Sequence, residues 1–188
     1  ASDGFSILAQ QTLSAGTATA QLSGARVSAE LDAVGWSTVK RDIGTGQSTL
    51  DADVIPAATN VLQYLQKVET SEFGALFIDR AGAVAFRDRA ELQAFTTGVT
   101  FSSSGIPYRD ISIVWGTEEM KNSVSITYTS GGSVAGTAIA DDFTAQGAYG
   151  IMDASYATIL SSPTEAAALA SWLVGLYAQP QYRVDSLT

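Results

Sequence analysis

The residues of this chain that could carry out chemistry are its carboxylates and serines, because the sequence contains no histidine and no cysteine. Without histidine, a serine nucleophile lacks its commonest general base, and no serine lies in a G-x-S-x-G motif. Without cysteine, disulfides and thiolate metal sites are excluded. We therefore expect a protein that is not an enzyme and that uses no cofactor and no metal ion.

The aspartates offer the closest approach to a metal site. Two pairs lie outside the predicted helices, Asp51 with Asp53 and Asp141 with Asp142. A calcium site at either pair would need more oxygen ligands within one loop, and no D-x-[DN]-x-[DN]-G pattern is present. Helix caps and solvated turns therefore explain these aspartates better than a bound cation.

Two further patterns are weak. Glu69 and Glu72 could be imagined as the carboxylate pair of a glycosidase, but three residues apart at a helix end they are both expected to face solvent. Gly44-Thr45-Gly46 is a lone G-x-G without the third glycine of a phosphate-binding fingerprint. A loop or hairpin turn is the simpler interpretation.

Aromatic and arginine residues favour packing and assembly. The three tryptophans lie far apart on apolar segments, which favours core or subunit-interface packing over a sugar site. Three arginines flank the tip of a predicted hairpin, where they are either solvated or form a salt-bridge cluster between subunits. The candidate interface residues are Arg80, Arg87, Arg89 and Trp115.

The central stretch, residues 61–89, predicts a helix followed by a β-hairpin. Apolar residues recur at helical spacing between positions 61 and 68, and Gly74 is a plausible C-cap. Residues 75–79 and 84–86 resemble strands around a turn in which Gly82 can adopt a positive φ. A helix with one apolar stripe and a hairpin with one apolar face are expected to cover each other.

The flanking segments predict further short elements. Before the centre we expect a short helix at 5–13, a loop at 14–23, a helix at 25–34 capped by Ser23, and an extended stretch at 41–50. After it we expect strands at 111–116, 124–128 and 134–140, a helical turn at 141–149, and an extended segment at 151–159. A final helix begins with the capping box of Ser162, Pro163 and Glu165, and a strand follows at 182–187.

These elements define an α+β protein of short antiparallel strands with three or four helices. The Thr- and Ser-rich stretch 91–105 is the best boundary, between helical segments plus the helix–hairpin unit at 1–100 and a β-rich unit at 106–188. A net charge of −9 disfavours stable nucleic-acid binding, and no apolar run is long enough to span a membrane. The chain begins and ends in mid-pattern, so we expect it to be part of a longer protein.

The order and spacing of these segments resemble phage minor tail or tail-tip proteins over about residues 24–188. The helix–hairpin part of the resemblance is carried by Leu65-Gln66, Glu72, Gly74, Leu76-Phe77, Asp79, Gly82, Val84, Phe86-Arg87 and Arg89. Further matching segments are RVSAELDAVGW at 26–36, Asn122 to Thr127, Gly131-Gly132, 141–150, and Ala170 to Thr188. Relatives usually carry an arginine soon after Tyr149-Gly150, whereas Ile151-Met152 follows here.

The resemblance implies a virion protein of tail-hub architecture, with barrel-like β units that carry a helix–hairpin insertion. Copies would form a ring around the tail lumen, typically a trimer, and would contact neighbouring tail-tube and tail-tip proteins. The chain would then join the tail tube to distal host-recognition or puncturing parts. The alternative is a carbohydrate- or receptor-binding module of a phage or bacterial surface protein, which Thr/Ser/Gly-rich strands with scattered aromatics permit.

Overall fold

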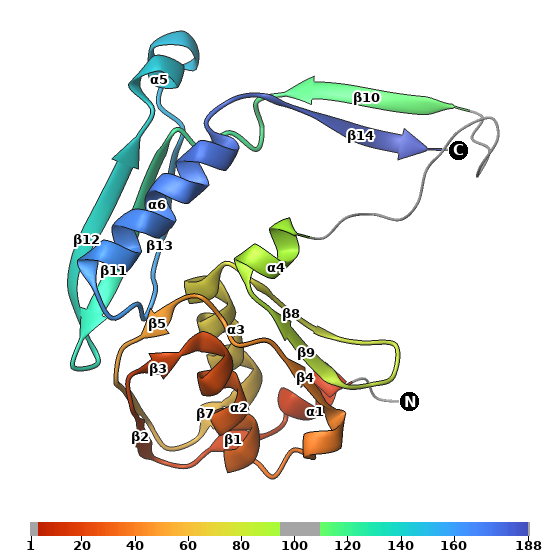
Figure 1. Cartoon of the computed structure of the whole chain (residues 1–188), viewed down its shortest axis with the longest axis vertical. Helices are drawn as coiled ribbons and strands as arrows, with labels where there is room; N and C mark the ends of the chain where they lie inside the picture. Colours follow the sequence, from red (N-terminus) through yellow and green to blue (C-terminus); the bar gives the residue numbers. More distant parts are fainter. Residues whose placement is uncertain (1–3, 95–109, 188) are drawn as a thin grey trace. The chain divides into compact units, whose positions relative to one another are not determined.

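The computed structural model describes residues 4–94 and 110–187 (Figure 1). The chain divides into two compact units, and each combines segments that are distant in the sequence. The first unit comprises Ala1–Ala94, Ile126–Ala138 and Tyr156–Ala167, and the second comprises Phe95–Ser125, Ile139–Ser155 and Ala168–Thr188. The predicted boundary between 100 and 106 falls outside the described residues and stays a prediction.

The elements confirm the α+β fold class. The helices are α1 (Gly4–Leu8), α2 (Ser23–Ala33), α3 (Val61–Glu72), α4 (Arg89–Gln93), α5 (Phe143–Tyr149) and α6 (Pro163–Tyr177), with one 3-10 turn at Thr38–Lys40. The described part holds six α-helices, more than the three or four expected. The short helix expected at 5–13 and the helical turn expected at 141–149 correspond to α1 and α5. The sequence missed α4, whose five residues are too few to show the apolar period.

The strands in the described part of the chain are short and form six small sheets. In chain order they are β1 (Thr12–Leu13), β2 (Gly16–Ala18), β3 (Gln21–Leu22), β4 (Arg41–Ile43), β5 (Thr49–Leu50), β6 (Asp53–Ile55), β7 (Thr59–Asn60), β8 (Ala75–Ile78), β9 (Val84–Arg87), β10 (Ile111–Gly116), β11 (Ser123–Ser130), β12 (Ser133–Asp141), β13 (Asp153–Tyr156) and β14 (Gln181–Leu187). The three-stranded sheets have the orders β4-β9-β8 and β12-β11-β13, and the other four are pairs. None of these sheets closes into a barrel over the residues that the structure describes.

The central helix and hairpin form as predicted. One face of α3 is buried through Val61, Tyr64, Leu65 and Val68, and α3 contacts β8. β8 and β9 pair antiparallel around a turn in which Gly82 has φ +75°. The sequence did not predict that β4 would join β9 in parallel, because a three-residue strand carries too little pattern.

The end of α3 differs from the prediction. Phe73, and not Gly74, takes the left-handed conformation at the C-cap, with φ 53° and ψ 37°. A Cβ atom at Gly74 would lie 2.2 Å from the carbonyl oxygen of Arg87. Glycine is therefore required at position 74 by the close approach of β9, and not by its own backbone angle.

The N-terminal region departs furthest from its prediction. α1 ends at Leu8, and residues 12–22, expected to complete this helix and then form a loop, instead hold β1, β2 and β3. Ser23 is the first residue of α2, and Leu22 occupies the N-cap position without a side-chain cap bond. The predicted Ser23 cap is wrong because its hydroxyl donates to the buried Glu72 carboxylate, at 2.7 Å.

The start of α6 is confirmed with one change. The backbone N–H of Glu165 donates to the Ser162 hydroxyl at 3.2 Å, as expected of an N-cap. The Glu165 carboxylate does not close the box on Ser162. It accepts instead from the backbone N–H of Thr49 at 3.0 Å and from the Ser161 hydroxyl at 3.2 Å. This glutamate therefore ties the helix start to β5, which is distant in the sequence.

Candidate assembly surface

The second unit contains a two-stranded ribbon made of β10 and β14 (Figure 1). In its antiparallel register Ile113 lies opposite Val184, and Trp115 lies opposite Tyr182. Alternate residues of a strand share one face of a sheet. The four side chains, with Ile111 two residues before Ile113, therefore lie on one side of the ribbon, which we call the ribbon face.

The ribbon face is apolar and exposed to solvent. The exposed fractions are 58% for Ile113, 54% for Trp115, 74% for Tyr182 and 56% for Val184. The rings of Trp115 and Tyr182 support each other, with centroids 4.4 Å apart. An isolated two-stranded ribbon is marginally stable in water, and clustered exposed apolar side chains mark sites of protein contact. The ribbon face is thus the strongest candidate for an assembly surface.

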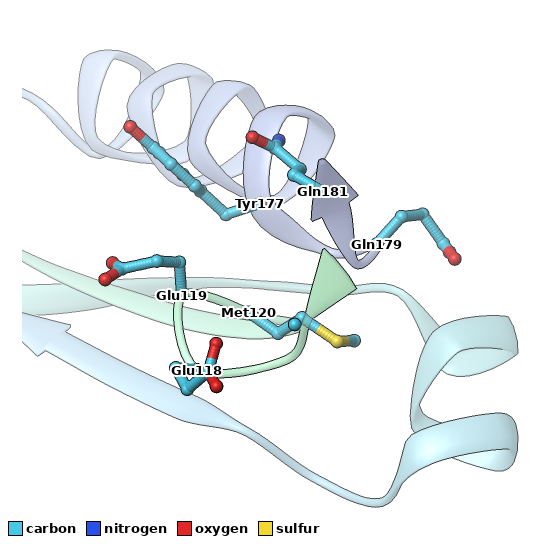
Figure 2. Close-up of a pocket in the computed structure, with 7 residues that line it drawn as sticks. Glu118, Glu119, Met120, Tyr177, Gln179 and Gln181 are labelled. Carbon is cyan, nitrogen blue, oxygen red and sulfur yellow. The ribbon is translucent and has the colours of Figure 1, made fainter. Parts of the chain in front are cut away.

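A small cavity lies at the end of the ribbon where β10 ends and β14 begins. It encloses about 110 Å³ and is lined by Gly116, Glu118, Glu119, Met120, Tyr177, Gln179 and Gln181. Figure 2 shows that the labelled side chains point in different directions and do not converge on one centre. The volume is well below the roughly 300–1,000 Å³ of typical ligand pockets. The cavity therefore gives little support to a specific ligand site.

Two of the three candidate arginines have partners within the chain. Arg87 forms an ion pair with Asp42, and its hydrogen bond holds the pKa of that carboxyl below its usual value. Arg89 donates to Glu72 at 3.1 Å and to the Ser48 hydroxyl at 2.7 Å. Arg80 is exposed in the turn after β8. The structure does not gather the three into one cluster, and their role between subunits stays a prediction.

The expectation that Glu72 faces solvent is wrong. Its side chain is fully buried, and its carboxylate accepts from Ser23, from Arg89, and from the backbone N–H of Ser48 at 2.8 Å. Glu69 is half-buried; it accepts from the N–H of Leu76 at 2.7 Å, while burial raises its pKa. Both glutamates thus hold structural contacts within the first unit.

The aspartates also have structural partners. Asp51 accepts from the backbone N–H of Gly132 at 3.1 Å, and Asp53 accepts from Tyr64 and Lys67, each at 3.1 Å. In the second pair, Asp142 caps the start of α5, and Asp141 accepts a hydrogen bond from the side chain of Gln146 in that helix. Among the described residues, no group of three or more metal-ligating side chains could hold an ion.

The lone G-x-G is used for backbone packing. The N–H of Gly24 at the start of α2 donates to the carbonyl of Thr45 at 3.1 Å. A Cβ atom on Gly24 would lie 1.9 Å from the carbonyl oxygen of Gly44. Carbonyl oxygens therefore occupy the helix N-terminus that a phosphate would need.

The sequence named Trp115 but missed its partners on the ribbon face. The alternation of Tyr182 and Val184 with polar residues was the available signal. It predicted a strand, but pairing between segments about 70 residues apart cannot be read from alternation alone. No helix in the described part of the chain is long and apolar enough to cross a membrane.

The fold of this chain is similar to that of solved tail proteins. A tail protein from Neisseria meningitidis MC58 matches with a TM-score of 0.54 and 12% identity, over 88% of this chain and 50% of that one. The prophage MuSo2 43 kDa tail protein from Shewanella oneidensis matches with a TM-score of 0.53 and 13% identity, over 92% of this chain and 52% of that one. This chain thus shares their fold and spans about half the length of each.

Comparison with protein-family models finds no match for this chain, and comparison with curated protein sequences finds none either.

Proposed function

We propose that this chain is a structural component of a phage tail and acts by assembly, without catalysis. The observation that carries the proposal is the exposed ribbon face, formed by Ile111, Ile113, Trp115, Tyr182 and Val184, on a fold shared with solved tail proteins. A surface of this kind gains stability when a neighbouring subunit covers it.

Within the tail, we place the chain at the tip or in the baseplate hub, between the tail tube and distal host-recognition or puncturing parts. The sequence resemblance to tail-tip proteins supports this position. A closed ring of identical copies, three in number, would cover the ribbon face of each copy through heterologous contacts. Specific stable interfaces bury roughly 1,200–2,000 Å² in total, so the ribbon face would form one part of a larger contact.

The net charge of −9 suits a tail component that DNA passes. Like charge on the wall of a lumen suppresses contacts with phosphates, so DNA would slide without binding. Charge density on the channel wall of the assembled particle tests this point. A predominantly basic wall would contradict it.

The second candidate is a carbohydrate- or receptor-binding module. The exposed pair of Trp115 and Tyr182 favours it, since aromatic rings with one polar edge are common in binding surfaces. A glycan array separates the two candidates, because the tail-hub proposal expects no specific sugar to bind.

The proposal is tested by removing the apolar character of the ribbon face in the particle. The double variant Trp115→Ser/Tyr182→Ser should lower incorporation into purified tails by at least about tenfold. A tenfold drop corresponds to a total loss of roughly 1.4 kcal/mol of binding free energy at the interface. Val39→Ser is the matched control, because Val39 is an apolar residue that is 85% exposed and belongs to the first unit, whereas the ribbon belongs to the second. Normal incorporation of the double variant, measured by mass spectrometry of particles, would remove the ribbon face from the assembly.

A further inference from the structure

A second hollow lies in the first unit, between helix α2 and the segment that carries β2 and β3. It has a volume of about 390 Å³, within the range of typical ligand pockets. Its walls are small, mostly exposed residues such as Gly16, Ala29 and Ala33. This hollow, which we call the α2 groove, is therefore open to solvent along its sides.

The floor of the α2 groove combines apolar surface with one carboxyl group. Leu13 is 3% exposed, Ile55 is 6% exposed, and Glu30 is 5% exposed. Glu30 is the one ionisable side chain among the lining residues. A floor of this composition matches a ligand that has a hydrocarbon stem and a positively charged end.

Glu30 receives no hydrogen bond from any residue that the structure describes. The nearest cation is Arg26, one turn earlier on α2, but its terminal N–H groups already donate to the Tyr64 hydroxyl and to the carbonyls of Thr19 and Asp51. Burial raises the pKa of Glu30, against the lowering effect of Arg26. Burial of the Glu30 side chain disfavours its charged form, and a cationic donor entering the groove would favour that form.

We infer that the α2 groove receives a lysine side chain from a neighbouring protein, with the ammonium group on Glu30 and the methylene stem on Leu13 and Ile55. The small walls let the partner's backbone approach closely. A lysine ammonium is a compact charge on a four-carbon stem, which suits a single carboxylate beside an apolar floor, whereas the planar fork of a guanidinium suits bidentate sites. A basic contact also complements the net charge of −9. The inference rests on the α2 groove alone and does not depend on the tail function.

The test uses the 188-residue chain and two probes, Nα-acetyl-lysine methylamide and its norleucine counterpart, which keeps the stem without the charge. In NMR titrations the lysine probe should shift the amide signals of Gly16, Ala29 and Ala33 saturably. It should bind at least roughly tenfold more tightly than the norleucine probe, as expected when one charged hydrogen bond is lost.

Two variants make the test specific. Glu30→Gln should reduce lysine binding to the level of norleucine, and Ala29→Phe should block both probes by filling the groove. Equal affinity for the two probes would overturn the inference, and so would no shift up to about 100 mM probe, a hundred times a millimolar Kd. Tighter binding of spermidine than of the lysine probe would also overturn it, in favour of a free polyamine. If Glu30→Gln does not fold, as judged by its NMR spectrum, the inference is decided by two other results. These are the relative affinity of the lysine and norleucine probes for the wild type, and the loss of binding in Ala29→Phe.

Discussion

At the scale of single residues, the structure uses its buried charges as connectors. Glu72 joins the start of α2, the loop before β5 and the start of α4, because it bonds Ser23, Ser48 and Arg89. Arg26 similarly joins α2 to α3 through Tyr64 and to two backbone carbonyls. Sequence patterns missed both roles, because a lone charge in a helix usually faces solvent and its partners lie up to 49 positions away.

Replacing Glu72 tests this role directly. Glu72→Ala removes the carboxylate that pairs with Arg89 and accepts from the backbone N–H groups of Gln47 and Ser48, so it should lower the free energy of unfolding by about 3 kcal/mol or more. Glu69→Ala, which removes one bond to a backbone N–H, should cost only about 1 kcal/mol. Urea denaturation of both variants gives the comparison, and equal losses of unfolding free energy would contradict a connecting role for Glu72.

Glu30 predicts a dependence of stability on pH. Its raised pKa means that the native state holds the proton more tightly than the unfolded chain, whose value is near 4.5. The contribution of this group is therefore full below that value and is lost as the pH rises through the folded pKa. Arg26 opposes the shift and Asp53 adds to it.

The variant Glu30→Gln removes this titration. The melting temperature of Glu30→Gln minus that of the wild type should therefore be higher at about pH 7.5 than at about pH 4. Thermal melts of both proteins at the two pH values measure this difference. Glu69, which also has a raised pKa, is present in both proteins and cancels in the comparison. A stability difference that stays constant between the two pH values would contradict the prediction.

At the scale of elements, the confirmed predictions are those with a long apolar period or a strong local signal. α3, the turn with Gly82 and the Ser162 cap all belong to this group. The short strands β1 to β7 were mostly missed, since two or three residues cannot display alternation. The capping box of Asp88 and Glu91 at the start of α4 was also missed, although its spacing is a recognised signal for the start of a helix.

The packing of α3 on its hairpin gives a prediction at this scale. Leu65 is fully buried, so Leu65→Asp would place a charge in the core and should lower the free energy of unfolding by at least roughly 3 kcal/mol. Gln66→Asp, one position along on the exposed side, is the control. Should Leu65→Asp melt within a degree or two of the wild type, the assignment of this unit would be wrong.

The N-cap at the start of α6 gives a second prediction at the scale of elements. Ser162→Ala removes the side chain that accepts from the N–H of Glu165, and should cost about 1 kcal/mol. Ser161→Ala is a comparison variant, because it removes a bond to the carboxylate of Glu165 but leaves the cap intact. Chemical denaturation of the two variants should rank Ser162→Ala as the more destabilised, and an unchanged midpoint would place the helix start elsewhere.

At the scale of the whole molecule, the α+β class could be expected from composition and pattern. The pairing of β10 with β14, which creates the ribbon face, could not, because it depends on contacts across the second unit. The ribbon face and the shared fold together lead to the proposal of a tail component. By itself the 188-residue chain is expected to be a monomer or a weak oligomer, because ring closure needs all the interfaces of the particle.

The central claim is that copies of this fold assemble in a phage tail. Electron microscopy of purified particles, at a resolution that shows helices, tests it most directly. We predict density for this fold at the tail tip in cyclic symmetry, with the ribbon face of each copy covered by a neighbour. Particles that lack the protein, together with full-length protein that stays monomeric at high concentration, would contradict the account and favour the surface-binding module.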